Sequence, residues 1–190
     1  MKKILIMILC VTFLLGCARW SFNKDISNGL QPASLRSSFN TQPVNFKDLS
    51  KCTTADVLVN IVNVEKNNSD TNIVWGSMVG WSINPQIMTD QIIAYMENSY
   101  KQCRVFTNKT SPKTIQVSIK SIEGFPNGAF KFTSNAVLKL NVSIPEKNYT
   151  ETFTANQSTG DLYMAVVYAI HDITWQIIND PVIQDYIVCR

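Results

Sequence analysis

The sequence predicts an α+β fold, a two-layer sandwich in which two long helices cover one face of an antiparallel sheet of four to five strands. Three observations carry this prediction. The predicted elements follow in the order strand, strand, helix, three strands, helix and short helix. Residues 114–125 and 129–144 alternate apolar and polar side chains with the period of two that is typical of a half-buried strand. Residues 162–179 repeat apolar side chains at helical spacing, so that helix has one face to bury against the sheet.

A cationic start and an apolar run open the chain of 190 residues. Lys2 and Lys3 precede an apolar run over residues 4–15, which is typical of a secretory signal peptide and is shorter than the roughly 20 residues that span a membrane. Residues 14–17, LLGC, resemble the lipobox of bacterial lipoproteins. The resemblance implies cleavage before Cys17, diacylglycerol on its thiol and acylation of its new amine. The alternative is an ordinary signal peptide, with Cys17 a small residue near the cut.

The same resemblance implies a location. Ala18 is not the Asp that tends to retain bacterial lipoproteins at the inner membrane, so we expect the outer membrane, with the domain facing the periplasm. The membrane is then a partner through the lipid anchor, because two or more acyl chains hold a protein stably on a bilayer. The predicted segments are a signal peptide (1–16), a lipidated cysteine with a flexible tether (17–54) and an α+β periplasmic domain (55–190).

The tether prediction rests on composition. Ser, Asn, Gln and Pro recur through residues 17–54 without a hydrophobic period. A flexible chain of this length spans roughly 35 Å on average, which would let the domain stand off the membrane. Trp20 and Phe22 follow the anchor closely, and their rings are expected either at the lipid headgroups or packed on the domain.

The first half of the domain is predicted to hold two strands and a helix. Residues 55–62 are apolar on both sides, which indicates a strand inside a sheet. A polar turn separates them from a second extended piece, residues 73–81, which could pair with the first strand as a hairpin. Asn84 as N-cap and Pro85 at the first helical position then begin a helix that runs to about residue 102. Met88, Ile92, Met96 and Cys103 form an apolar stripe at helical spacing along it.

The second half is predicted to hold three strands and two helices. The strands cover residues 114–125, 129–144 and 149–157, and their polar faces are expected to face water. A capping turn precedes the long helix over residues 162–179, and a short final helix covers residues 181–188.

Five cysteines constrain the redox chemistry. Cys10 leaves with the signal peptide and Cys17 carries the lipid, so Cys52, Cys103 and Cys189 remain as candidates for one disulfide in the oxidising periplasm. We favour Cys52–Cys103, with Cys103–Cys189 next, and three free thiols as the alternative. The chain has no C-x-x-C pair and one histidine, so neither a metal site nor a cofactor is predicted.

Charge and catalytic motifs exclude two classes of function. Removing the leader lowers Lys+Arg from 17 to 15 against 14 Asp+Glu, a net charge of about +1, which argues against nucleic acid as a partner. The sequence lacks a nucleophile elbow, a phosphate loop and a zinc-protease motif. His171 adjoins Asp172, but neighbouring residues on a helix do not face each other. We predict no catalytic residues and no enzymatic activity.

Residues 73–81, IVWGSMVGW, are the stretch that folding explains least. Trp and Met are enriched at contact surfaces, so Trp75, Met78 and Trp81 are candidates for contact with a partner or with lipid. The alternative is an edge strand covered by the first helix.

The end of the chain supplies a second resemblance. A Gly-Asp turn, an amphipathic helix and then DPVIQDYI resemble the YajG-type periplasmic lipoproteins, in the order of elements over residues 55–188. The same order is similar to small auxiliary lipoproteins of envelope-transport machines. The resemblance implies no enzymatic activity and transfers no binding residues. We therefore expect an outer-membrane lipoprotein that binds a protein partner as an accessory or scaffold in an envelope assembly or transport complex. The alternative is a carrier or sensor that binds lipid or glycan.

Overall fold

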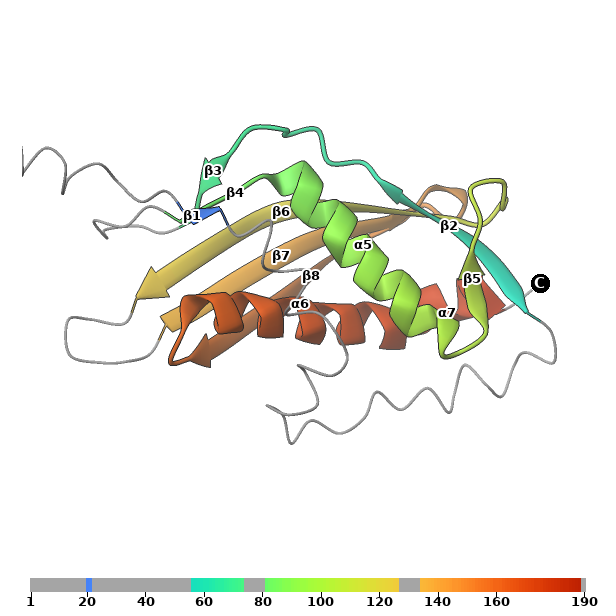
Figure 1. Ribbon diagram of the computed structural model, residues 1–190. Helices are drawn as coiled ribbons and strands as arrows, with labels where there is room; N and C mark the ends of the chain where they lie inside the picture. The colour runs from blue at the N-terminus through green and yellow to red at the C-terminus, as the bar shows by residue number, and fades with distance from the viewer. Residues whose placement is uncertain (1–19, 22–55, 74–80, 127–133, 189–190) are drawn as a thin grey trace, which may run out of the picture.

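The computed structural model describes residues 20–21, 56–73, 81–126 and 134–188. Its elements combine short N-terminal strands with three helices and a long β-meander (Figure 1). In chain order they are β1 (Trp20–Ser21), β2 (Val57–Asn63), β3 (Thr71–Asn72), β4 (Trp81–Ile83), α5 (Pro85–Lys101), β5 (Val105–Thr107), β6 (Thr114–Pro126), β7 (Ser134–Ile144), the 3-10 turn η2 (Pro145–Lys147), β8 (Tyr149–Thr159), α6 (Leu162–Asn179) and α7 (Pro181–Val188).

The main sheet has five strands in the order β5-β2-β6-β7-β8, which confirms the α+β class and the strand count. The expected purely antiparallel pairing is wrong, because the sheet is mixed. β6, β7 and β8 form an antiparallel meander, whereas β2 runs parallel to both β5 and β6. The cause is α5, which carries the chain across the sheet between β2 and β5, and a crossover of this kind returns the chain in the same direction. The three-residue strand β5 was not predicted from the sequence.

The expected hairpin between the first two strands is also wrong. Both edges of β2 are occupied, by β5 on one side and by β6 on the other. β4 instead pairs antiparallel with β3 and parallel with β1, in a separate small sheet. Residues 74–80, the middle of the stretch expected to be extended, lie outside the described residues.

The two long helices begin at the predicted caps. The side-chain oxygen of Asn84 accepts a hydrogen bond from the Ile87 N–H at 3.1 Å, and Pro85 is the first residue of α5. The Asp161 carboxylate accepts from the Tyr163 N–H at 3.1 Å and caps α6. Each cap satisfies an N–H that the helix itself leaves without a partner. α7 is the short third helix expected at the chain's end.

The core lies between the helices and one face of the main sheet. α5 packs over β2, β5 and β6, and α6 packs over β7 and β8 (Figure 1). The predicted apolar stripes are the buried faces of both helices. These stripe residues are Met88, Ile92 and Met96 on α5, and Leu162, Val166, Ala169, Ile170, Ile173 and Ile177 on α6. Along β7 every second side chain, from Ala136 to Ile144, is fully buried under the helices. The alternation of apolar and polar residues in the sequence therefore corresponds to one buried face of the sheet.

In the described part of the chain, none of the helices combines the length and the apolarity needed to cross a membrane.

Candidate functional site

Most of the predicted site residues lie outside the described residues. These are Cys17, Cys52, Cys189, Trp75 and Met78. Trp81 is the first residue of β4, where its backbone pairs with Trp20 of β1. The predicted contact surface at residues 73–81 therefore stays a prediction.

Cys103 is described. It follows the C-terminal end of α5 and carries a free thiol that is buried, with 4% of its surface exposed. Its Sγ donates to the Ser99 carbonyl at 3.8 Å, and burial raises the pKa of the thiol to about 12. A thiol protonated at neutral pH is a poor nucleophile and a poor metal ligand. The disulfide predictions are not tested, because Cys52 and Cys189 are outside the described residues. Within the described ranges, no group of three or more His, Cys, Asp and Glu residues could hold a metal ion.

His171 lies between the two long helices and is partly buried. Its ring centroid is 6.2 Å from that of Tyr95 on α5, with the rings tilted at 46°. Burial lowers the pKa of His171, and the Asp172 carboxylate offsets part of that change. Asp172 itself accepts a hydrogen bond from Gln157 of β8 at 3.1 Å. These contacts join α6 to α5 on one side and to β8 on the other.

A polar cluster fixes α7 to the sheet, and the sequence offered no signal for it. The Tyr186 hydroxyl donates to the Glu146 carboxylate at 2.9 Å and accepts from the Thr114 N–H at 2.6 Å. Lys113 donates to the Ile187 carbonyl at 2.7 Å. Burial, helped by the hydrogen bond to Glu146, raises the pKa of Tyr186 to about 12, so this hydroxyl keeps its proton at neutral pH. The cluster satisfies partly buried groups where three elements meet, which is a structural role.

The outer edge of β8 is the largest unpaired backbone surface in the described residues. The main sheet has two edge strands, β5 with three residues and β8 with eleven, and the edge strands of the small sheet, β1 and β3, have two residues each. β8 pairs with β7 from Ser134↔Thr159 to Ile144↔Tyr149 without a register shift, and no described strand pairs with its other edge. Natural edge strands are usually protected by Pro, Lys, bulges or short length. β8 contains no Pro and no Lys, so its edge is long and regular.

Two side-chain contacts show which backbone groups of β8 point outward. The Thr152 N–H donates to the Glu151 carboxylate at 3.0 Å, and the Thr154 carbonyl accepts from Gln176 of α6 at 3.1 Å. In an antiparallel pair, alternate residues direct both backbone groups to the same neighbouring strand. The even-numbered residues of β8 therefore present their N–H and C=O groups along the free edge.

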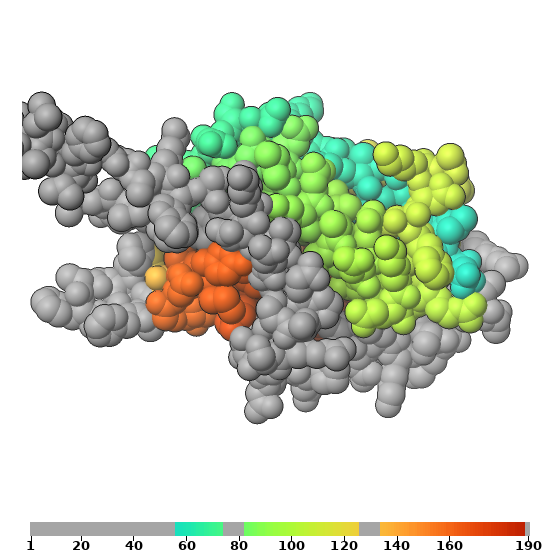
Figure 2. All heavy atoms as spheres, in the orientation of Figure 1, coloured from blue at the N-terminus to red at the C-terminus, as the bar shows by residue number. Residues whose placement is uncertain are grey.

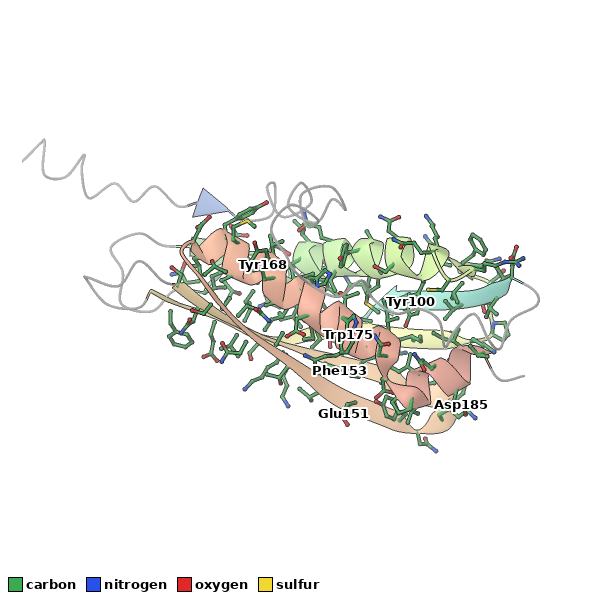
Figure 3. The ribbon with its side chains drawn as sticks, turned by 90° about the horizontal axis from the view of Figure 1, so that it is seen from below. Tyr100, Glu151, Phe153, Tyr168, Trp175 and Asp185 are labelled. Carbon is green, nitrogen blue, oxygen red and sulfur yellow. The ribbon has the colours of Figure 1, made fainter. Side chains whose placement is uncertain are left out.

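The two sides of this edge differ in chemistry. On the sheet's open face, polar side chains pair across the strands. Thr152 donates to Asn141 at 2.9 Å and accepts from Lys120 at 3.4 Å, and Ser143 donates to Gln116 at 3.3 Å. On the other side α6 passes over the strand, and Figure 3 shows Phe153 of β8 beneath Trp175. Trp175 is 43% exposed, and the next residue of α6, Gln176, makes the hydrogen bond to β8. Figure 2 shows the helix-covered side, where the outer faces of α5 and of the first turns of α6 are visible.

Comparisons with known proteins find two solved structures of distant similarity. No family model matches the sequence, and no curated protein matches it. The structure is similar to the crystal structure of a Xanthomonas campestris protein of the DUF330 family, with a TM-score of 0.45 and 13% identity over 65% of this chain and 81% of that one. It is also similar to the crystal structure of an uncharacterized protein, with a TM-score of 0.35 and 8% identity over 66% of this chain and 89% of the other. Identities this low indicate nothing about shared function.

Proposed function

We propose that this chain is an outer-membrane lipoprotein of the YajG-like type that acts as a scaffold or accessory in an envelope assembly or transport complex. In this proposal residues 1–16 are removed, Cys17 is acylated, and the α+β domain faces the periplasm without catalysing a reaction. The lipobox at residues 14–17 supports the anchor. The observation that carries the scaffold role is the free edge of β8.

Strand addition is the mode of partner binding that this edge favours. An extended peptide laid along a sheet edge gains main-chain hydrogen bonds for affinity, and its alternate side chains meet the two faces of the sheet for specificity. The even-numbered residues of β8, from Thr150 to Ser158, provide the hydrogen-bonding edge. Of their backbone groups, the Thr152 N–H and the Thr154 carbonyl bond to the side chains of Glu151 and Gln176, and a bound peptide would replace those two side chains. On one side the peptide would meet the polar face, where Lys120 donates to Thr152 at 3.4 Å, and on the other it would meet the α6 side chains that bond to β8, such as Gln176.

A carrier that binds lipid or glycan is the second candidate. Leu138 and Leu140 of β7 and Ile170 of α6 are fully buried in the core between the sheet and the helices. A lipid bound between these two layers would have to displace that packing. The open face favours a glycan instead, because the hydroxyl and amide groups of Thr152, Asn141 and Gln116 suit sugar hydroxyls.

Thr152→Pro tests the edge with little disturbance of the fold. The Thr152 N–H is bonded to a side chain instead of to β7, so Pro removes an outward donor and leaves the β7–β8 ladder in place. Thr152→Ala is the matched control, since it also loses the hydroxyl bond to Asn141 but keeps the N–H. We expect wild type and Thr152→Ala to retain the same protein partner in a mild-detergent pull-down, and Thr152→Pro to retain about tenfold less, which corresponds to ~1.4 kcal/mol.

A Trp75→Ala/Trp81→Ala double variant separates the two candidate surfaces. Loss of the partner in this variant, with full retention in a folded Thr152→Pro protein, would move the contact to residues 73–81 and overturn the edge proposal. If no protein is retained and mass spectrometry finds a bound lipid or glycan, the carrier function is correct. Circular dichroism of each variant shows that it is folded.

A further inference from the structure

We propose that the lipid anchor holds the domain close against the bilayer by one particular end, and that residues 17–54 do not act as a spacer. We call this the anchor end. It consists of β3, β4, the last residues of β6 and the first turn of α6. The inference rests on the proposed acylation of Cys17 and adds the orientation that the acylation would impose.

The pairing of β1 with β4 is the first observation. Trp20 and Ser21 pair in parallel with Trp81 and Ser82. Trp20 follows Cys17 by three residues, and an extended chain covers at most ~3.6 Å per residue, so about 11 Å is the greatest separation of their Cα atoms. An acylated Cys17 would therefore place the β1–β4 pair close to the membrane surface.

The anchor end is a packed part of the domain, which is the second observation. The Gly124 N–H of β6 donates to the Ile73 carbonyl, just after β3, at 2.5 Å. A Cβ at Gly124 would lie 3.0 Å from the Leu162 side chain at the start of α6. Ile73 and Ile83 are both fully buried. Because these elements are packed together, fixing β4 near the membrane fixes the domain.

The surface of this end suits the lipid headgroup region without binding it strongly. Phe125 is 38% exposed beside Gly124, and aromatic rings are favoured at the level of the headgroups. The exposed groups nearby include Thr71 and Asn72, which are neutral, and Asp161, which is acidic. This end offers no cationic patch in its described residues to attract anionic lipid, so the acyl chains must supply the affinity.

An orientation for the whole sheet follows. β7 leaves the anchor end and β8 returns to it, with η2 at the far end (Figure 1). Eleven residues of β8 at ~3.3 Å each put η2 about 36 Å from the anchor end. The free edge of β8 would then extend from the bilayer into the periplasm.

Two insertions of the same linker test the inference in the full-length lipidated protein on phosphatidylethanolamine vesicles. A Gly-Ser linker of about ten residues is placed after Ala18, before β1, or after Ser34, beyond β1. Distance to the bilayer is measured by energy transfer from a dye at Ser158→Cys or Lys147→Cys to a headgroup acceptor, with Cys52 and Cys189 replaced by Ser. Ser158 is an exposed residue at the anchor end and Lys147 an exposed residue at the far end.

We expect stronger energy transfer from position 158 than from position 147. The linker after Ala18 should move the domain outward by about 15 Å and weaken transfer from position 158, whereas the linker after Ser34 should leave it unchanged. Equal transfer from the two positions, or an equal response to the two linkers, would overturn the inference even if intact mass shows an acylated Cys17. An intact mass without acyl groups would overturn the proposed function and this inference together. Unchanged melting temperatures show that both inserted proteins fold.

Discussion

At the scale of single residues, His171 links stability to pH. Burial between α5 and α6 lowers its pKa, so the fold favours the neutral ring. A group with a lowered folded-state pKa contributes stability fully above its unfolded pKa of about 6.5, and that contribution is lost as the pH falls toward the folded value. We expect wild type to lose more stability than His171→Gln between pH 7 and pH 5. Urea unfolding at the two pH values measures this, and parallel losses would contradict it.

Gly124 gives a second prediction at this scale. A methyl group there would approach the Leu162 side chain at 3.0 and 3.1 Å and the Ile73 carbonyl at 3.3 Å. We expect Gly124→Ala to cost about 1–3 kcal/mol through overpacking. Leu162→Ala should relieve part of the clash, so the double variant should lose less stability than the two single variants predict by addition. Additive losses in denaturant unfolding would show that Leu162 is not the obstacle.

At the scale of elements, Asp180 holds α7 in place. Its carboxylate accepts hydrogen bonds from the Val182 N–H at 3.0 Å and the Ile183 N–H at 2.9 Å. Asp180→Ala should cost about 1 kcal/mol, because it leaves two helix N–H groups without a partner. Asp180→Asn keeps a capping oxygen and should lower the free energy of unfolding by only about a few tenths of 1 kcal/mol. Thermal unfolding compares the two, and equal losses would assign the effect to the lost charge.

The elements also show what local sequence patterns can predict. Some features could be predicted from the sequence because each depends on residues close together in the chain. These are the caps at Asn84 and Asp161, the apolar stripes of α5 and α6, and the alternation along β7. β5 was missed because three residues carry no usable period. The edge of β8 could not be read as a candidate surface either. Its threonines predicted a solvated face, but the sequence does not say which strand comes last in a sheet.

At the scale of the whole molecule, the anchor has a matched pair of variants. Cys17→Ser removes the thiol that the acyl transfer needs, so we expect an unprocessed precursor without lipid. Cys10→Ser lies inside the leader and should be processed normally. Intact mass and membrane fractionation measure both. Normal cleavage and membrane retention of Cys17→Ser would rule out lipobox processing.

The sequence by itself determined the α+β class, the starts of the long helices and the buried face of each long element, and it predicted the leader with its lipobox. The fold class, the helix starts and the buried faces follow from capping residues and periods within one segment, whereas the lipobox rests on the resemblance of residues 14–17 to bacterial lipoproteins. The tertiary structure decided the parallel pairing of β2, the free edge of β8 and the pairing of β1 with β4. These depend on which strands become neighbours. Neighbours are chosen by packing and hydrogen bonding between segments as far apart in the chain as Trp20 and Trp81, and such choices leave no local pattern in the sequence.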